Sequence, residues 1–273
     1  MIGIYRGLVD DALVRVRSPQ VQLWVVEAGR RGPFAESSRL PEDVRDIVAR
    51  LEGVAAAGSV TYQSGEATLG ARKLRFNVVG YEFGRPGEPP PLVAGRPITR
   101  GHYELIADRR ARMPLGTAIR LGRNVFTVVG LTNGQVDSGG NPVVYMTISD
   151  AQRLQFELEG DAARAQAARG VAQNRNIVNA VVARLSPGVS AESVATVIRR
   201  WKHLSVLTQA EQEAMLLESV VEKARRQIGL FTATLLLVST VIIALIVYTL
   251  TLDKMREIAT LKLIGAPDRT IVG

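Results

Sequence analysis

The longest apolar run in the chain lies near its C-terminal end and contains no charged residue. It extends from Ile228 to Leu252, and its polar members are only Thr, Ser and Tyr. A helix of about 20 apolar residues crosses a hydrocarbon layer ~30 Å thick. Charged residues flank both ends, as expected where a helix leaves the bilayer: Arg225, Arg226, Asp253, Lys254 and Arg256. The pattern predicts a transmembrane helix at 228–252, the alternative being a fully buried helix of a soluble protein.

A second helical pattern leads directly into this run. Thr208 and Glu211 have the T-x-x-E spacing of a capping box, in which each residue satisfies a free backbone N–H of the other. No Pro or Gly follows until Gly229. We therefore expect a stalk helix at 208–227 that continues without a break into the membrane segment.

Before residue 208 the pattern alternates between strands and helices. We expect strands at 21–26, 54–62 and 67–83, with a turn at Ser64-Gly65 between the last two. A helix is expected from about Pro41 to Glu52, because Val44, Ile47, Val48 and Leu51 recur at helical spacing and Gly53 can end it. The run Gly84–Pro91 (GRPGEPPP) suits neither helix nor central strand, so we expect a linker between two lobes.

The part after this linker is richer in strand signals. Strands are expected at 104–107, 118–121, 125–131, 143–148, 177–185 and 205–207, with a hairpin turn at 122–124. A short helix should begin at Ser149-Asp150. Another is expected from Ser190 to Lys202, with Val194, Val197, Ile198 and Trp201 as its apolar stripe. These elements predict an α+β fold with mixed sheets, packed helices and a β-rich lobe at about 92–148.

Composition narrows the possible chemistry. The chain has 273 residues and no cysteine, which excludes disulfides, thiolate metal sites and cysteine nucleophiles. Its net charge is +8, but the basic residues are scattered, and no basic stripe interleaved with aromatic residues is present. We therefore expect no nucleic-acid partner.

The search for catalytic motifs finds none that is specific. No lysine is followed by Ser or Thr, so the phosphate-binding loop of ATPases is absent. The two histidines, His102 and His203, lack metal-ligand spacing. His102 beside Tyr103 and Glu104 suggests an acid–base cluster, but an ordinary loop histidine is favoured. Asp137-Ser138 is interpreted as a turn. We expect no catalytic, cofactor or metal site, and no enzyme activity.

Three stretches resemble a known family. The core Arg256–Ala266 (REIATLKLIGA), directly after the apolar run, is similar to the cytoplasmic coupling segment of FtsX/MacB-type ABC transporter permeases. Gly95–Leu131 resembles their extracytoplasmic domain, and Leu23–Pro41 resembles the DevC-like branch, which exports hydrophobic or glycolipid cargo.

The resemblance implies an organisation and a set of partners. Residues 1–207 would form a two-lobed MacB-like periplasmic domain, 208–227 a stalk, 228–252 an inner-membrane span and 253–273 a cytoplasmic coupling segment. A cytoplasmic ABC ATP-binding subunit would contact the segment, and a homodimer, a periplasmic adaptor, an outer-membrane channel and membrane lipid are also implied. The implied ATPase contacts are Arg256, Glu257, Leu261, Lys262, Gly265 and Ala266.

The chain departs from the family in its number of spans. The family has four, and only the second is found here, so we expect a truncated gene, a start assigned too late or a shortened version of the protein. Two alternatives to export remain open. One is an FtsX-like relay that signals to a cell-wall hydrolase, and the other is a single-span adaptor or receptor.

Overall fold

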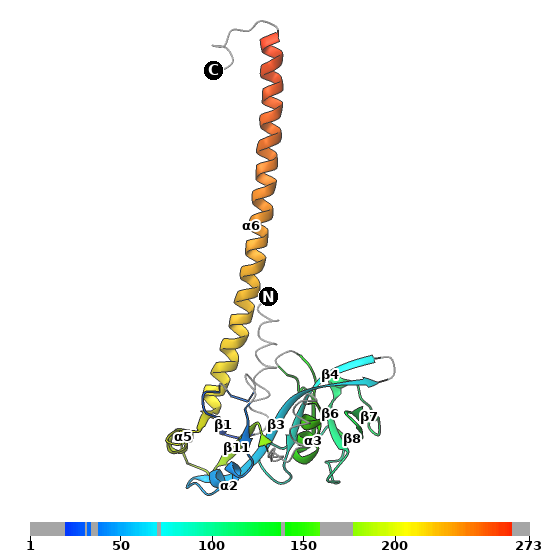
Figure 1. Ribbon diagram of the computed structural model, residues 1–273, viewed down its shortest axis with the longest axis vertical. Coiled ribbons are helices and arrows are strands. Elements are labelled where there is room, and N and C mark those ends of the chain that lie inside the picture. Colours follow the sequence, from blue (N-terminus) through cyan, green and yellow to red (C-terminus); the bar gives the residue numbers. More distant parts are fainter. Residues whose placement is uncertain are drawn as a thin grey trace, which may run out of the picture. The chain divides into compact units, whose positions relative to one another are not determined.

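The computed structural model describes residues 20–30, 32–33, 38–69, 72–137, 140–158 and 177–263, with backbone alone at 216–217, 219–226 and 261–263. The chain divides into two units, residues 1–218 and 219–273. The first unit holds all the strands that are described, together with the shorter helices (Figure 1).

Strands and helices alternate through the first unit. The strands are β1 (Leu23–Glu27), β2 (Leu40–Pro41), β3 (Val54–Leu69), β4 (Arg72–Tyr81), β5 (Ala94–Gly95), β6 (Glu104–Asp108), β7 (Ala118–Leu121), β8 (Asn124–Thr132), β9 (Val143–Thr147), β10 (Ile177–Val178), β11 (Ala180–Leu185) and β12 (Leu204–Thr208). The helices are α2 (Val44–Ala49), the 3₁₀ helix η1 (Arg109–Ala111), α3 (Ile148–Leu158), α5 (Ala191–Arg199) and α6 (Gln209–Leu263).

Within the described residues, ten strands form one sheet in the order β12-β1-β11-β3-β4-β9-β6-β8-β5, with β7 paired to β8. The pairs β4–β9 and β6–β8 are parallel, and the other strand pairs of this sheet are antiparallel. The expected α+β fold, with a mixed sheet and packed helices, is confirmed. The long strands β3 and β4 join the two halves of the sheet, so the β-rich part shares its backbone hydrogen bonding with the rest.

The first half of the sheet is buried on both faces. Leu23 and Val25 of β1 pack in a core beneath α2 and α5, whereas Trp24 and Val26 face a second core on the other side. Successive strand residues point to opposite faces, which explains why the apolar residues of β1 are consecutive rather than alternating.

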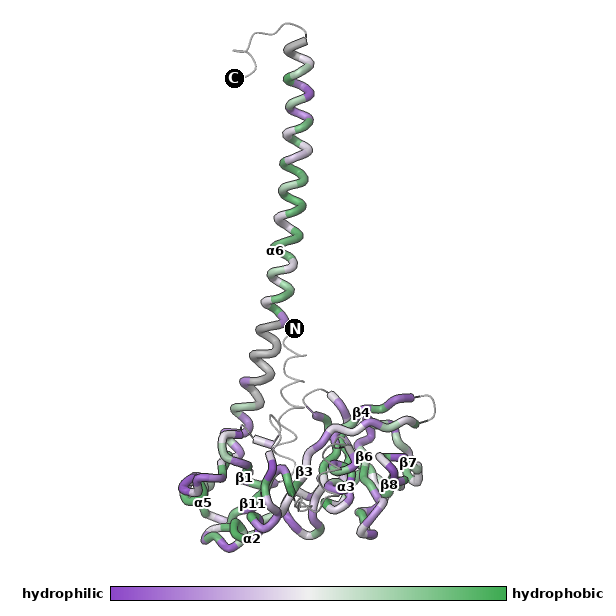
Figure 2. The backbone as a smooth tube through the Cα atoms, viewed as in Figure 1, coloured by the Kyte–Doolittle hydropathy of each residue, from purple (hydrophilic) through white to green (hydrophobic). Residues whose placement is uncertain are grey.

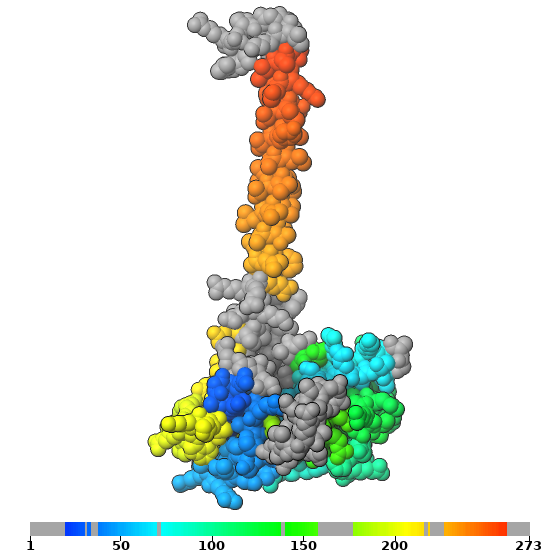
Figure 3. Space-filling view, viewed as in Figure 1, coloured from blue at the N-terminus to red at the C-terminus, as the bar shows by residue number. Residues whose placement is uncertain are grey.

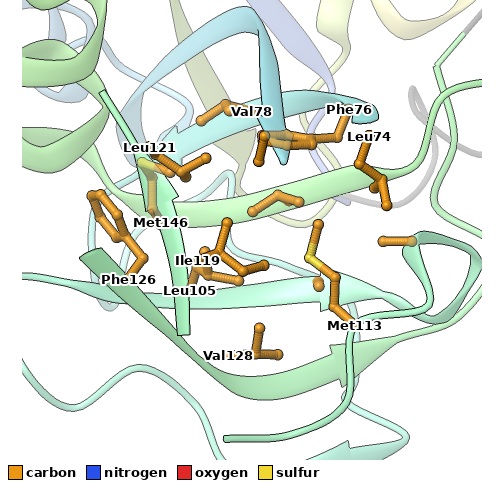
Figure 4. Close-up of a cluster of buried hydrophobic side chains, with 14 of the residues drawn as sticks. Leu74, Phe76, Val78, Leu105, Met113, Ile119, Leu121, Phe126, Val128 and Met146 are labelled. Carbon is orange, nitrogen blue, oxygen red and sulfur yellow. The ribbon is translucent and has the colours of Figure 1, made fainter. Parts of the chain in front are cut away.

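The second half has its own core (Figure 4). Phe76 of β4, Leu105 of β6, Phe126 of β8 and Met146 of β9 are almost completely buried in it. Helix α3 adds Leu154 to this core and packs closely on β4 at Gly80. A Cβ atom on Gly80 would lie 2.4 Å from the Cβ atom of Ala151, so the close approach requires glycine.

The turn expected at Ser64-Gly65 does not exist. Both residues lie inside the continuous β3–β4 ladder, opposite Asn77 and Phe76, and the ladder reaches the Leu69–Arg72 pair. Gly65 serves packing here, because a Cβ atom on it would lie 2.7 Å from Phe76 Cε2. In the sequence, a glycine that makes room for an aromatic ring therefore cannot be distinguished from a glycine that forms a turn.

Two predicted helices are shorter than expected. α2 begins at Val44, because Pro41 pairs with Ile177 in the small β2–β10 sheet instead of opening the helix. Ile47, predicted to face the core, is 51% exposed. α5 ends at Arg199, and Val197 is also exposed. Short helices need only a narrow buried stripe, so not every apolar position at helical spacing is buried.

The strand expected at 177–185 is interrupted at Asn179. The Asn179 side chain accepts the Tyr62 N–H at 2.8 Å and donates to the Ser38 carbonyl oxygen at 2.8 Å. One amide side chain thus links β3 to the segment before β2, which separates β10 from β11.

The segment after β4 is packed against the sheet. Pro86 and Gly87 are buried, and a Cβ atom on Gly58 of β3 would lie 2.2 Å from the Pro86 carbonyl oxygen. Arg85 also donates to the Ala57 carbonyl oxygen at 3.3 Å. This Pro- and Gly-rich segment therefore covers part of β3 on its way from β4 to β5.

Candidate functional site

The capping box predicted at the start of α6 is confirmed. The Thr208 N–H donates to Glu211 Oε2 at 2.8 Å, and the Glu211 N–H donates to Thr208 Oγ1 at 3.3 Å. Glu211 Oε1 also accepts from Arg199 Nη2 at 2.8 Å, and the Arg199 Nη1 atom contacts Glu192. The first turn of α6 is thereby connected to α5 as well as to β12.

An apolar stretch of α6 lies further along the same helix. Among the described residues, Gln227–Thr260 is the one helical segment long and apolar enough to cross a membrane, with a mean hydropathy of 2.7 in its most apolar window. Figure 2 shows the hydrophobic colouring along this part of α6. Its Leu, Ile and Val side chains are exposed throughout (Figure 3). The segment is therefore not a buried helix of the described part of the protein.

Four threonine hydroxyls of this stretch are hydrogen-bonded within the helix. Threonine hydroxyls donate to the carbonyl oxygen four residues earlier, which removes the cost of placing them in an apolar medium. The donors are Thr234, Thr240, Thr249 and Thr251, bonded to Leu230, Leu236, Leu245 and Val247 respectively.

The six predicted ATPase-contact residues begin on the last turns of α6. Arg256 and Glu257 are exposed, and the Glu257 carboxylate accepts from Lys254 Nζ at 2.7 Å. Leu261 and Lys262 lie on the same helix, where the backbone alone is described. Gly265 and Ala266 lie outside the described residues. The sequence analysis did not single out the Lys254–Glu257 pair, although its i,i+3 spacing is typical of helical ion pairs.

Comparison with known proteins identifies the family. The model of the MacB-like periplasmic core domain matches residues 1–201. The chain belongs to this family. The periplasmic region of MacB from Actinobacillus actinomycetemcomitans is a similar solved structure. It aligns over 95% of its own chain and 74% of this one, with a TM-score of 0.51 at 14% identity. That likeness concerns the fold alone.

The MacB-like domain and the helix that follows it are also distantly similar to whole permeases. Uncharacterized ABC transporter permeases of Mycobacterium tuberculosis and Mycobacterium bovis are 22% identical over 273 residues, which is 100% of this chain and 70% of each relative. The similarity therefore continues beyond the MacB-like domain into α6.

Inside the MacB-like domain, the suspected acid–base cluster is divided between two separate networks. Glu104 is buried and accepts two hydrogen bonds from Arg96, at 2.5 and 3.0 Å, together with the backbone N–H groups of Thr99 and Arg100. These bonds, chiefly those from Arg96, lower the pKa of Glu104 to about 2. His102 instead contacts Asp150, 2.8 Å from Nδ1 to Oδ1.

No group of three possible metal-binding side chains occurs among the described residues. Asp137, the other residue considered for catalysis, accepts two hydrogen bonds from Asn141 within a turn. Ser138 lies outside the described residues. The partners Arg96 and Asp150 were missed in the sequence analysis. Asp150 is 48 residues from His102, and no spacing rule connects them.

Proposed function

We propose that this chain is part of an ABC transporter permease that transmits conformational change between a cytoplasmic ATPase and an extracytoplasmic domain. The observation that carries the proposal is the continuity of α6. Its first turn is hydrogen-bonded into the MacB-like domain, its middle is apolar and exposed, and its last turns are charged. A continuous helix transmits displacement along its axis better than a flexible linker does.

In this proposal the ATP is hydrolysed by a separate subunit. The sequence contains no phosphate-binding loop, and its distant relatives are permeases. The coupling contacts would be made by residues in the last turns of α6 and in the segment that follows it. They are Arg256, Glu257, Leu261, Lys262, Gly265 and Ala266.

The proposed topology follows the family name and the resemblance of the segment after the apolar run to a cytoplasmic coupling segment. Residues 1–227 would lie outside the cytoplasm, as a domain at 1–207 and a stalk at 208–227. Residues 228–252 would cross the inner membrane as part of a homodimer, and 253–273 would lie in the cytoplasm. Export of hydrophobic or lipid-like cargo toward an adaptor and an outer-membrane channel is supported by the resemblance to the DevC-like branch.

The coupling role can be tested with the full-length permease reconstituted together with its ATP-binding subunit. We expect Glu257→Lys to reduce permease-dependent ATPase stimulation at least about tenfold, because like charges placed at an interface cost several kcal/mol. Membrane extraction of the variant should match that of the wild type. Glu66→Lys is the matched control, since it makes the same charge change at an exposed strand position.

Three results would contradict parts of the proposal. Unchanged stimulation in Glu257→Lys would exclude the coupling role of this residue. Equal loss in Glu66→Lys would show a general charge effect. A wild-type permease that neither binds nor stimulates an ATP-binding subunit would overturn the proposed function as a whole.

A further inference from the structure

A buried carboxylate organises an exposed loop on the β-rich half of the domain. Asp150, in the first turn of α3, is 1% exposed. Its Oδ1 atom lies 2.8 Å from His102 Nδ1, and its Oδ2 atom accepts the Tyr103 N–H at 2.8 Å. One side chain thereby determines the position of two consecutive residues, whose side chains remain about half exposed.

The same loop is held from its other side. Glu104, also buried, accepts the backbone N–H groups of Thr99 and Arg100 at 2.9 and 3.1 Å. Tyr103 has a φ of +65°, a left-handed conformation that is unfavourable for a bulky residue. Burying two carboxylates and straining one residue is costly for a surface loop, and such costs concentrate at binding sites.

Three polar side chains lie close together here, with the ring centroids of His102 and Tyr103 5.8 Å apart. Asp150 favours the tautomer with hydrogen on His102 Nδ1, which leaves Nε2 free on a ring whose side chain is 48% exposed. Arg153 Nη1 donates to the Tyr103 hydroxyl at 3.0 Å, so the hydroxyl hydrogen is free to donate elsewhere. Arg153 has no ion pair within the part of the chain that the structure describes, and its remaining N–H groups are available.

Packing explains only part of this geometry. The Tyr103 ring meets the buried Phe126 edge-on, with centroids 5.7 Å apart, and so covers the core. A phenylalanine would do the same. Covering the core requires neither the orientation of His102 by a buried carboxylate nor an arginine at the Tyr103 hydroxyl.

We propose that His102, Tyr103 and Arg153 form a binding site for a phosphate group. Arg153 Nη1 lies 3.0 Å from the Tyr103 hydroxyl, and the ring centroids of His102 and Tyr103 are 5.8 Å apart, so all three side chains are close enough to contact one tetrahedral anion. In the tautomer that Asp150 favours, His102 Nε2 accepts a hydrogen bond from an O–H group of the ligand. Arg100, whose side chain is 81% exposed and lies 3.8 Å from Glu104, is a further basic group in the same loop.

The two histidines of the chain allow a direct test. The full chain, labelled with ¹⁵N only at histidine and held in phosphate-free dodecyl maltoside micelles, is titrated while the ring nitrogens are observed by NMR. His203 serves as the internal control. One arm adds inorganic phosphate, a second adds dihexanoyl phosphatidylglycerol below its micelle concentration, and sodium chloride matches the ionic strength.

We expect a saturable shift of the His102 signal alone. Arg153→Gln should weaken binding about tenfold or more, and Tyr103→Phe several-fold, because each removes a hydrogen bond to a charged group. Arg120→Gln, at an exposed position of β7 outside the site, should have no effect. Tighter binding of phosphatidylglycerol would assign the site to a lipid headgroup, and tighter binding of inorganic phosphate would assign it to a free phosphate.

Three outcomes would overturn the proposal. The first is that the His102 signal shows no saturable shift up to roughly 50 mM of either compound. The second is that the His203 signal shifts in parallel. The third is that both Arg153→Gln and Tyr103→Phe bind as well as the wild type. Tyr103→Phe retains the ring that covers Phe126, so it keeps the test decisive if Arg153→Gln fails to fold.

Discussion

The guanidinium of Arg199 donates to the carboxylate of Glu211, with 2.8 Å between Nη2 and Oε1, and so connects α5 to the first turn of α6. The same carboxylate completes the capping box with Thr208. One side chain therefore stabilises both the beginning of α6 and its attachment to the domain.

The two roles of Glu211 are separable by substitution. We expect Glu211→Ala to lower the free energy of unfolding by about 1–2 kcal/mol, since it removes both the cap and the ion pair. Glu211→Gln retains a side chain suited to a capping box and should cost less than about 1 kcal/mol. Denaturant unfolding measures both. Equal losses in the two variants would show that the cap contributes nothing.

The stability of the domain should depend on pH through Glu42. Burial raises the pKa of Glu42 above its usual value near 4.5, and the neighbouring Glu82 raises it further, while Arg45 opposes this. The protonated form is thus favoured by folding. Glu42 therefore contributes to the free energy of unfolding fully below pH 4.5. This contribution is lost as the pH rises through the higher pKa of the folded state.

Replacing Glu42 by glutamine should remove this dependence. We expect Glu42→Gln to unfold at a higher temperature than the wild type near neutral pH, with a smaller advantage toward pH 4.5. Thermal unfolding monitored by circular dichroism measures this. A variant less stable than the wild type at neutral pH would show that the attraction between Glu42 and Arg45 outweighs burial.

Glu104 should behave in the opposite sense. The pKa of Glu104 is lowered to about 2. Its contribution to the free energy of unfolding is therefore present above pH 4.5 and is lost as the pH falls through about 2. Because Arg96 is half exposed, we expect Glu104→Gln to cost roughly 2–3 kcal/mol at neutral pH rather than more. The exposed pair Glu66–Arg75 is the control, and Glu66→Gln should change stability by less than about 0.5 kcal/mol.

The packing role of Gly65 predicts a coupled pair. Gly65→Ala places a methyl group 2.7 Å from Phe76 Cε2 and should destabilise the domain by about 1–3 kcal/mol. A smaller side chain at position 76 should relieve the clash. In a double-mutant cycle, Gly65→Ala should therefore cost less in a Phe76→Leu background than alone. Equal costs in both backgrounds would contradict the contact.

Local signals were sufficient wherever the deciding interactions are close in sequence. The Thr208–Glu211 capping box depends on residues three apart, and the β7–β8 hairpin joins Leu121 to Asn124. Length and composition alone were sufficient to predict the apolar stretch of α6. In each case the sequence alone determined the result, because a helix end, a tight turn and an uncharged run are properties of a few consecutive residues.

Tertiary structure decided what depends on distant partners. The sheet places Asp150 against His102 and Tyr103, although 47 or more residues separate them. Gly65 proved to accommodate Phe76 rather than to form a turn, and Asn179 divides a strand by binding Tyr62 and Ser38. Strand register determines which side chains meet across a sheet, and register results from packing of the whole domain. A single sequence therefore shows which groups are present, and the fold decides which of them come together.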